Sequence, residues 1–145
     1  MTTLRKSREE CYSGAMRMLV RREHSTLELS HKLKNKDFDQ DDIDSVIASL
    51  IQKDYQSNER FTTEFIQMRF NQGKGPIKIR LDLKQRGIDK FDLSGFDFYA
   101  LAYKIRERKF GQSVPSDFKE KAKQQRFLQS RGFSFEHINQ SFKNA

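Results

Sequence analysis

The sequence has few of the residues that crosslink a chain, interrupt it or anchor it in a membrane. It contains one cysteine, Cys11, which excludes an intramolecular disulfide and suits a reducing compartment. Two prolines and seven glycines in 145 residues disfavour long irregular stretches and favour helix. No apolar run approaches the roughly 20 residues that span a bilayer, and the polar first ten residues lack the apolar region of a secretory signal. We therefore expect a cytoplasmic protein with no membrane segment.

Groupings of residues that carry out catalysis or hold a metal are also missing from the sequence. The three histidines, His24, His31 and His137, include no pair at the i, i+4 spacing of a helical zinc site, and one cysteine cannot build a thiolate site. The stretch Gly73-Lys74-Gly75-Pro76 has neither spacing of a phosphate-binding glycine loop. The sequence predicts no active site, no metal and no cofactor, and hence a protein that is not an enzyme.

Positive charge is in excess, and it is unevenly distributed. The chain has 28 Lys and Arg against 20 Asp and Glu, a formal net charge of +8, which favours a polyanionic partner. Residues 37–59 carry a net charge of −6, whereas residues 69–90 and 104–131 carry +5 and +6. Thirteen Phe and four Tyr argue for a folded chain, because disordered chains are poor in aromatic residues.

Signals for helix ends recur along the chain. Ser7 and Ser25 are each followed three residues later by Glu, the spacing of a capping box, in which the two side chains bond free backbone N–H groups. Pro76 suits a first helical turn. Three glycines follow basic residues and suit helix C-caps: Gly87, Gly111 and Gly132. Apolar residues follow helical spacing over 43–51, 98–105 and 135–142, so we expect helices with one buried face.

One pattern occurs three times, in residues 33–38, 83–88 and 128–133. Each copy has Leu, three polar residues that end in Lys or Arg, then Gly or Asp, then a large apolar residue. Spacings of 50 and 45 residues are typical of helical arrays. The alternation of apolar and polar residues over 77–83 taken alone indicates a strand, but its counterpart in the first copy carries helix signals, so we predict helix there.

The repeat predicts an all-α fold of three tandem three-helix repeats in an elongated array. The expected bounds are residues 1–57, 58–96 and 97–145. The middle repeat looks degenerate, because its third helix, near residues 92–96, carries Gly95 and is short. We expect a bend there.

Three groups of residues resemble the RecX family of bacterial regulatory proteins. They are Arg21-Arg22-Glu23-His24-Ser25 with Glu28-Leu29 and Lys32-Leu33; Arg60-Phe61, Arg69, Gly73-Lys74-Gly75-Pro76, Ile79, Leu83 and Gly87-Ile88; and Lys109-Phe110-Gly111, Lys123, Arg126-Phe127-Leu128, Arg131-Gly132-Phe133 and Ile138. The resemblance covers nearly the whole chain, in order. It departs from the pattern at Asp37, where the other two copies of the repeat have glycine, which puts the geometry of the first turn in doubt.

The resemblance implies a curved array that docks in the groove of the filament formed by the RecA recombinase on single-stranded DNA. Such a protein is a negative modulator of RecA that inhibits ATP hydrolysis, filament extension and strand exchange, within homologous recombination, DNA repair and the SOS response. We expect it to act as a monomer.

The candidate residues for binding the filament or nucleic acid are basic. Those at motif positions are Arg21, Arg22, Lys32, Arg69, Lys74, Arg86, Lys109, Arg126 and Arg131, and those beside the motifs are Lys78, Arg80, Lys104, Arg106 and Arg108. Some of them stand at helix ends, where stabilisation of the helix dipole would also explain them. Two alternatives remain open: a nucleic-acid-binding helical module that acts without RecA, and a scaffold that docks through its acidic first repeat.

Overall fold

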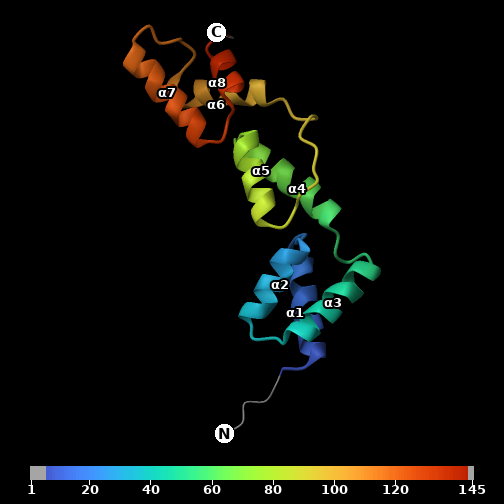
Figure 1. Cartoon of the computed structure of the whole chain (residues 1–145). Coiled ribbons are helices and arrows are strands. Elements are labelled where there is room, and N and C mark those ends of the chain that lie inside the picture. The colour runs from blue at the N-terminus through green and yellow to red at the C-terminus, as the bar shows by residue number, and fades with distance from the viewer. Residues whose placement is uncertain (1–5, 144–145) are drawn as a thin grey trace. The chain divides into compact units, whose positions relative to one another are not determined.

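The computed structural model describes residues 6–143, and within that range all regular structure is helical. The eight helices in this range are α1 (Arg8–Arg21), α2 (Thr26–Asn35), α3 (Gln40–Gln52), α4 (Asn58–Asn71), α5 (Pro76–Gln85), α6 (Phe98–Phe110), α7 (Phe118–Ser130) and α8 (Phe135–Ser141) (Figure 1). The predicted all-α fold is therefore confirmed. None of the helices over residues 6–143 is long and apolar enough to cross a membrane.

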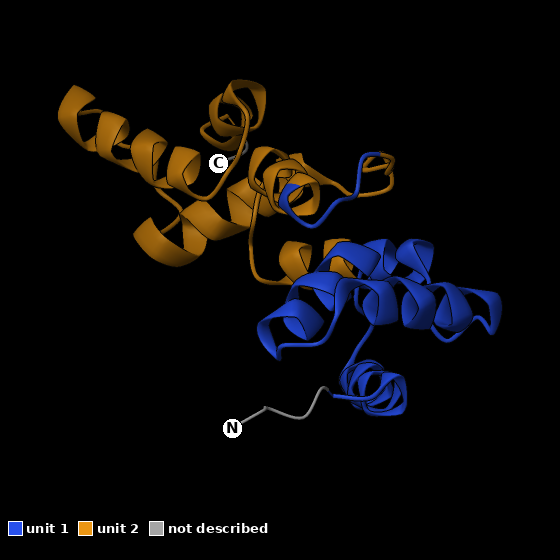
Figure 2. Ribbon diagram, turned by 60° about the horizontal axis from the view of Figure 1, so that its bottom comes forward, with its two compact units in different colours: residues 1–64, 85–89 blue, residues 65–84, 90–145 orange. Residues whose placement is uncertain are grey.

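The chain forms two compact units (Figure 2). Unit 1 contains Met1–Glu64 and Gln85–Asp89, and unit 2 contains Phe65–Lys84 and Lys90–Ala145. The division falls inside α4, so the residues assigned to the middle repeat contribute to both units. The bounds of 1–57, 58–96 and 97–145 stay a prediction.

The three copies of the repeated pattern have the same local structure. Leu33, Leu83 and Leu128 are fully buried. The apolar residue five positions later in each copy is also buried: Phe38, Ile88 and Phe133. Residues 77–83 lie within α5, so the helix predicted from the repeat is confirmed and the strand suggested by alternation is wrong. The buried residues Ile79 and Leu83 are four positions apart, as on one face of a helix, so helical packing and not the alternating apolar pattern decides the conformation of this segment.

The turn after each repeated leucine is left-handed in all three copies. Asp37 has φ 67°, close to the 79° of Gly87 and the 95° of Gly132. Aspartate tolerates this region better than most residues, which explains how the first copy dispenses with glycine. The Phe38 and Phe133 N–H groups donate to the carbonyl oxygens of Leu33 and Leu128 at 3.3 Å, which closes the helix end.

The middle repeat lacks its third helix. Residues 92–96, where we predicted a short helix, form a turn in which the Ser94 N–H donates to Asp92 Oδ1 at 2.9 Å. Leu93 is nevertheless buried, like Ile43 and Ile138 at the matching positions of the other copies. The segment therefore keeps its core contact but not its helical backbone.

Each unit has its own apolar core. In unit 1, α1, α2 and α3 pack around residues that include Cys11, Leu29, Ile43 and Leu50. Burial raises the pKa of the Cys11 thiol and so keeps it protonated. In unit 2, α6 packs against α7 and α8. Aromatic rings fill part of its core: Phe70 lies 5.1 Å from Phe96 and 5.5 Å from Phe98 between ring centroids.

Candidate nucleic-acid interface

Glu28 is the centre of an ionic cluster at the start of α2 in unit 1. Its carboxylate accepts two hydrogen bonds from Arg22, both 3.1 Å, and lies 3.7 Å from Arg86 Nε. It also accepts from the Ser25 N–H, while Ser25 Oγ accepts from the Glu28 N–H, which completes the predicted capping box. Burial raises the pKa of Glu28, but hydrogen bonds from Arg22 and Ser25 outweigh it and leave that pKa below its usual value. Arg22 and Arg86 therefore have structural partners.

His24 is buried beside this cluster, with both ring nitrogens occupied. Its Nδ1 lies 3.0 Å from the Arg22 carbonyl oxygen, and its Nε2 lies 2.9 Å from Lys32 Nζ. A neutral ring that donates from Nδ1 and accepts the Lys32 ammonium at Nε2 satisfies both contacts. Burial lowers the pKa of His24, which favours this neutral form. Lys32 is an exposed residue, but its ammonium donates a hydrogen bond to buried His24 and so has a structural partner.

In unit 2, Asp82 is an acidic residue that pairs with two candidate cations, as Glu28 does in unit 1. It is only 2% exposed and lies 3.3 Å from Arg69 Nε and 3.1 Å from Lys78 Nζ. Burying a carboxylate without opposite charge would be costly, so the two cations compensate it. Arg69 and Lys78 were candidates for partner binding, and the structure gives each of them an intramolecular ion pair.

Arg106 is not a surface residue. We grouped it with the basic surface, but it is fully buried in unit 2. Its guanidinium donates to the carbonyl oxygens of Ser141 and Ser113 and to Gln124 Oε1, at 3.2–3.4 Å. It also lies 5.0 Å from the Phe142 ring centroid, where the cation is attracted to the ring face. Arg106 therefore joins α6 to α7 and to the end of α8. Its assignment to the basic surface was wrong, because a buried guanidinium cannot contact a partner.

The glycine-containing turn before α5 joins two backbones of unit 2. The Gly75 N–H donates to the Arg131 carbonyl oxygen at 2.8 Å, and the Ile77 N–H donates to that of Gly132 at 2.9 Å. A Cβ at Gly75 would lie 2.3 Å from the Gly132 carbonyl carbon, so no side chain fits there. The turn Gly73-Lys74-Gly75-Pro76 is rich in glycine because its backbone packs closely against that of Gly132, not because it binds a phosphate.

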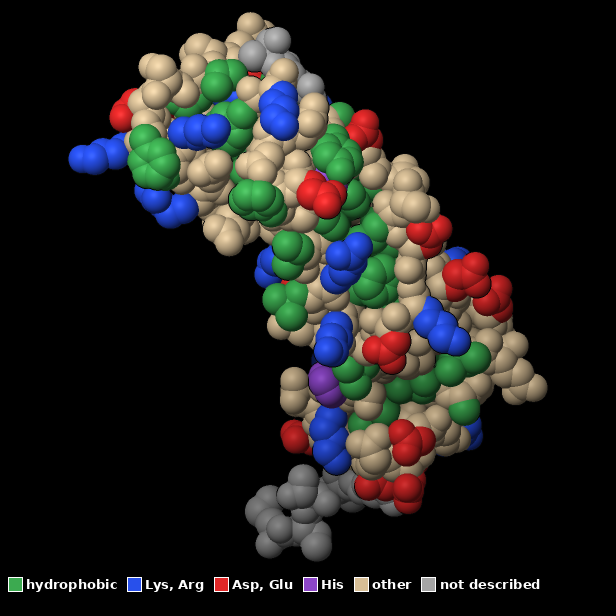
Figure 3. All heavy atoms as spheres, turned by 45° about the horizontal axis from the view of Figure 1, so that its top comes forward, with side chains coloured by type: hydrophobic (Ala, Val, Ile, Leu, Met, Phe, Trp, Pro, Cys, Tyr) green, Lys and Arg blue, Asp and Glu red, His purple; other side chains and the backbone are tan. Residues whose placement is uncertain are grey.

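Among the candidate residues, the cations that are exposed and have no ion pair within residues 6–143 are most numerous on α6 and α7 of unit 2. Lys104, Arg108, Lys109 and Arg126 are exposed, and none of the four has an ion pair within residues 6–143. Lys119 and Lys123, which our candidate set omitted, are exposed on α7 as well. Their spacing of four residues on a helix places them on one face, and this was the available sequence signal. Figure 3 shows Lys and Arg side chains gathered at the upper left, over the region of α7.

Phe127 lies among these cations. Its ring packs edge-on against Phe110 at 5.4 Å between centroids, which brings the end of α6 next to α7. Lys109 Nζ and the Arg131 guanidinium carbon lie 5.4 and 5.2 Å from the Phe127 ring centroid. Both rings are partly exposed. The ring thus holds positive charge at this part of unit 2, which suits contact with the phosphates of a nucleic acid backbone. We call Lys104, Arg108, Lys109, Arg126 and Phe127 the α6–α7 surface.

The remaining candidates lie apart from the α6–α7 surface in the sequence. Arg21 is exposed in the last turn of α1 in unit 1. In unit 2, Lys74 is partly exposed in the turn before α5, and Arg80 is exposed on α5. Within residues 6–143, no group of three or more His, Cys, Asp or Glu could hold a metal ion.

Comparison with known proteins identifies the family. Models of the first, second and third three-helix domains of RecX match residues 11–50, 57–93 and 97–141. The regulatory protein RecX of Legionella pneumophila is 36% identical over 140 residues, which cover 92% of this chain and 93% of that protein. The chain belongs to the RecX family.

Other RecX proteins agree with this assignment. That of Halorhodospira halophila is 34% identical over 136 residues, 90% of this chain and 84% of that protein. The crystal structure of RecX from Lactobacillus salivarius has a TM-score of 0.78 at 21% identity and covers 94% of this chain and 95% of that one. A second RecX crystal structure has a TM-score of 0.79 at 21% identity, over 95% of this chain and 73% of that one. These two structures support the fold.

The structure shows what several residues that resemble the RecX family do. Ser25 and Glu28 cap α2, Arg22 holds Glu28, and Arg60 bonds Glu23 at 2.7 Å. Gly75 and Gly132 allow two backbones to meet. Much of the resemblance therefore consists of residues that maintain the fold.

Proposed function

We propose that this RecX-family chain is a negative modulator of RecA that binds the RecA–single-stranded-DNA filament. Bound there, it inhibits ATP hydrolysis, filament extension and strand exchange. Membership of a family of regulatory proteins supports this proposal, together with a surface suited to a nucleoprotein. The activity needs binding but no catalytic group. We further propose that the protein acts in the cytoplasm as a monomer.

The α6–α7 surface is the observation that carries the proposal. Its four exposed cations have no carboxylate partner within residues 6–143, so their charge is available to phosphates or to acidic groups of a filament. Each phosphate neutralised by Lys or Arg releases counterions, which makes such binding strong at low salt and weak at high salt. Lys109 and Arg131 lie over the partly exposed Phe127 ring, which holds their positive charge at this part of unit 2.

The test measures ATP hydrolysis by RecA on single-stranded DNA, and filament length by electron microscopy, as the protein is added. We expect both to fall as the protein approaches stoichiometric amounts. The double variant Arg108→Gln/Arg126→Gln should need about tenfold more protein for the same inhibition. The matched control Arg8→Gln/Lys34→Gln removes the same charge from exposed positions of unit 1 and should inhibit like the unchanged protein.

Two results would contradict the proposal. Unchanged ATP hydrolysis and filament length at stoichiometric protein would exclude RecA modulation. If the protein also bound bare oligonucleotides with a steep salt dependence, a nucleic-acid-binding module that acts without RecA would be the better account. Equal loss of inhibition in both double variants would reject the α6–α7 surface while leaving RecA modulation in place.

A further inference from the structure

Gly14 occupies a position in the middle of α1 where the fold does not require glycine. Glycine inside a helix is destabilising relative to alanine. A Cβ at Gly14 would meet only ordinary contacts: Leu33 Cδ2 and Phe38 Cε2 at 3.8 Å, and Arg17 Nη2 at 4.0 Å. Alanine would therefore fit, and the packing of unit 1 does not explain the missing side chain. Gly14 is itself buried, and its missing side chain leaves space beside Leu33, Phe38 and Arg17.

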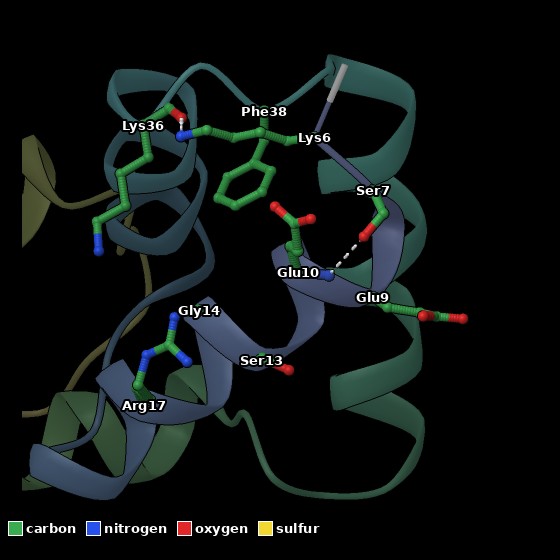
Figure 4. A pocket seen from close by; sticks show the side chains of 9 residues that line it. All are labelled: Lys6, Ser7, Glu9, Glu10, Ser13, Gly14, Arg17, Lys36 and Phe38. Carbon is green, nitrogen blue, oxygen red and sulfur yellow. Dashed lines mark hydrogen bonds between the residues drawn. The ribbon is translucent and has the colours of Figure 1, made fainter. Parts of the chain in front are cut away.

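Gly14 lies where two hollows of unit 1 adjoin. The first, of about 630 Å³, lies between α1 and the turn after α2, and the second, of about 440 Å³, continues along α1. Gly14, Arg17 and Lys36 line both hollows. Figure 4 shows the first hollow, with Arg17 reaching it from α1 and Lys36 from the end of α2. We call the two together the α1 groove.

Cations line both hollows of the α1 groove, whereas acidic residues line only the first. The second hollow is lined by three cations, Arg17, Arg21 and Lys36, and by no acidic residue. Its other lining side chains are Met16, Met18 and Val20, and Val20 is 81% exposed. The first hollow adds Lys6, whose ammonium lies 5.0 Å from the Phe38 ring centroid, and also two acids, Glu9 and Glu10. Glu9 points away from Arg17 and Lys36 (Figure 4).

We propose that the α1 groove binds an acidic segment of a protein partner, and that this segment uses the space left open where Gly14 lines the groove. Carboxylates of the segment would pair with Arg17 and Lys36, and an apolar side chain would lie against Met16, Met18 and Val20. Methionines adapt to differently shaped apolar groups. The second hollow has no aromatic ring on which an unpaired base could stack, which favours a peptide over single-stranded nucleic acid. The site belongs to unit 1 alone and goes beyond the function proposed for the α6–α7 surface.

The probe is a fluorescently labelled synthetic peptide of repeated Asp-Glu-Leu, and the measurement is its anisotropy as the full-length protein is added. We expect saturable binding that weakens about tenfold or more in Arg17→Glu/Lys36→Glu, because unlike charges become like charges. The control Arg8→Glu/Lys34→Glu makes the same change of charge at exposed positions outside the groove and should bind like the unchanged protein. Gly14→Ala should bind several-fold more weakly and yet melt at a higher temperature.

The combined effect of Gly14→Ala separates a binding role from a structural one, since a packing defect would lower both affinity and melting temperature. No saturable binding of the peptide would overturn the proposal, as would equal losses in the two charge-reversal variants or unchanged binding by Gly14→Ala. Equally strong displacement of the peptide by oligo-dT would assign the groove to nucleic acid. Sedimentation that shows self-association abolished by Arg17→Glu/Lys36→Glu would assign it to a second copy of the chain. Either of these results would also overturn the proposal.

Discussion

Replacing Gly132 with alanine should destabilise unit 2 far more than replacing a comparable glycine elsewhere. Gly132 has φ 95°, and a residue with a side chain pays roughly 1–2 kcal/mol in such a left-handed conformation. Its new Cβ would also lie 2.4 Å from Lys78 Cβ and 2.8 Å from the Lys78 backbone nitrogen. The start of α5 would have to move away from the end of α7.

That movement would break the two hydrogen bonds that join these segments, from the Gly75 and Ile77 N–H groups to the carbonyl oxygens of Arg131 and Gly132. At about 1 kcal/mol each, their loss and the backbone strain together give a destabilisation of about 3–4 kcal/mol. A change of this size lowers the melting temperature by roughly 10 °C in a protein of this length.

Two further glycines serve as controls in the same experiment. Gly111 has φ 91° but no heavy atom within 4 Å of an added Cβ, so Gly111→Ala should cost only the strain, about 1–2 kcal/mol. Gly95 has neither constraint, and Gly95→Ala should leave stability unchanged or raise it slightly. Urea unfolding followed by circular dichroism measures all three. If Gly132→Ala cost no more than Gly111→Ala, the backbone contact between α5 and α7 would be refuted.

Three other predictions concern charged and titratable groups. Asp82→Ala should destabilise the protein by about 1–3 kcal/mol, because the partly exposed Arg69 and Lys78 lose their partner. Asp89→Ala at an exposed position should stay within about 0.5 kcal/mol. Equal losses would contradict a structural role for Asp82. Glu28→Gln keeps a capping acceptor but loses the charge that pairs with Arg22, so the free energy of urea unfolding should fall by about 1 kcal/mol. An unchanged free energy of unfolding would show that the ion pair does not stabilise the protein. Burial lowers the pKa of His24 from its usual 6.5 and lowers that of His137 as well, so the unfolded chain takes up these protons before the folded one. The free energy of unfolding should therefore fall as pH falls below about 6.5. His24→Gln should remove part of this dependence, with replacement of exposed His31 as the control, and an unchanged dependence in His24→Gln would contradict the role given to His24.

Local sequence signals were sufficient to predict most of the helical framework. The turns after Leu33 and Leu128 and the Ser25–Glu28 capping box depend on contacts within a few residues, which the sequence displays directly. The helix over α5 was predicted only because the repeat overruled its alternating pattern. The missing third helix of the middle repeat was not predicted, although Gly95 marked the segment as irregular.

The candidate interface was harder to predict, because a basic residue looks the same in sequence whether or not the fold pairs it. Arg106 follows Ile105 on α6 at the next position of the apolar stripe that starts at Phe98, and this position was the available sign of burial. Its partners could not be predicted in this way, because Gln124 and Ser141 lie 18 and 35 residues away. Arg69 likewise meets its carboxylate, Asp82, only once α4 and α5 have packed. Which basic residues are paired by the fold and which stay exposed without an ion pair thus depends on tertiary structure.

Site-specific crosslinking tests most directly whether the α6–α7 surface faces the RecA filament. A photoreactive amino acid placed at Arg126 on α7 is compared with one at Asp44, exposed on α3 of unit 1, after each protein is bound to RecA on single-stranded DNA. We predict that the probe at Arg126 joins the protein to RecA or to the DNA and that the probe at Asp44 does so far less. Crosslinks from Asp44 with none from Arg126 would contradict the account.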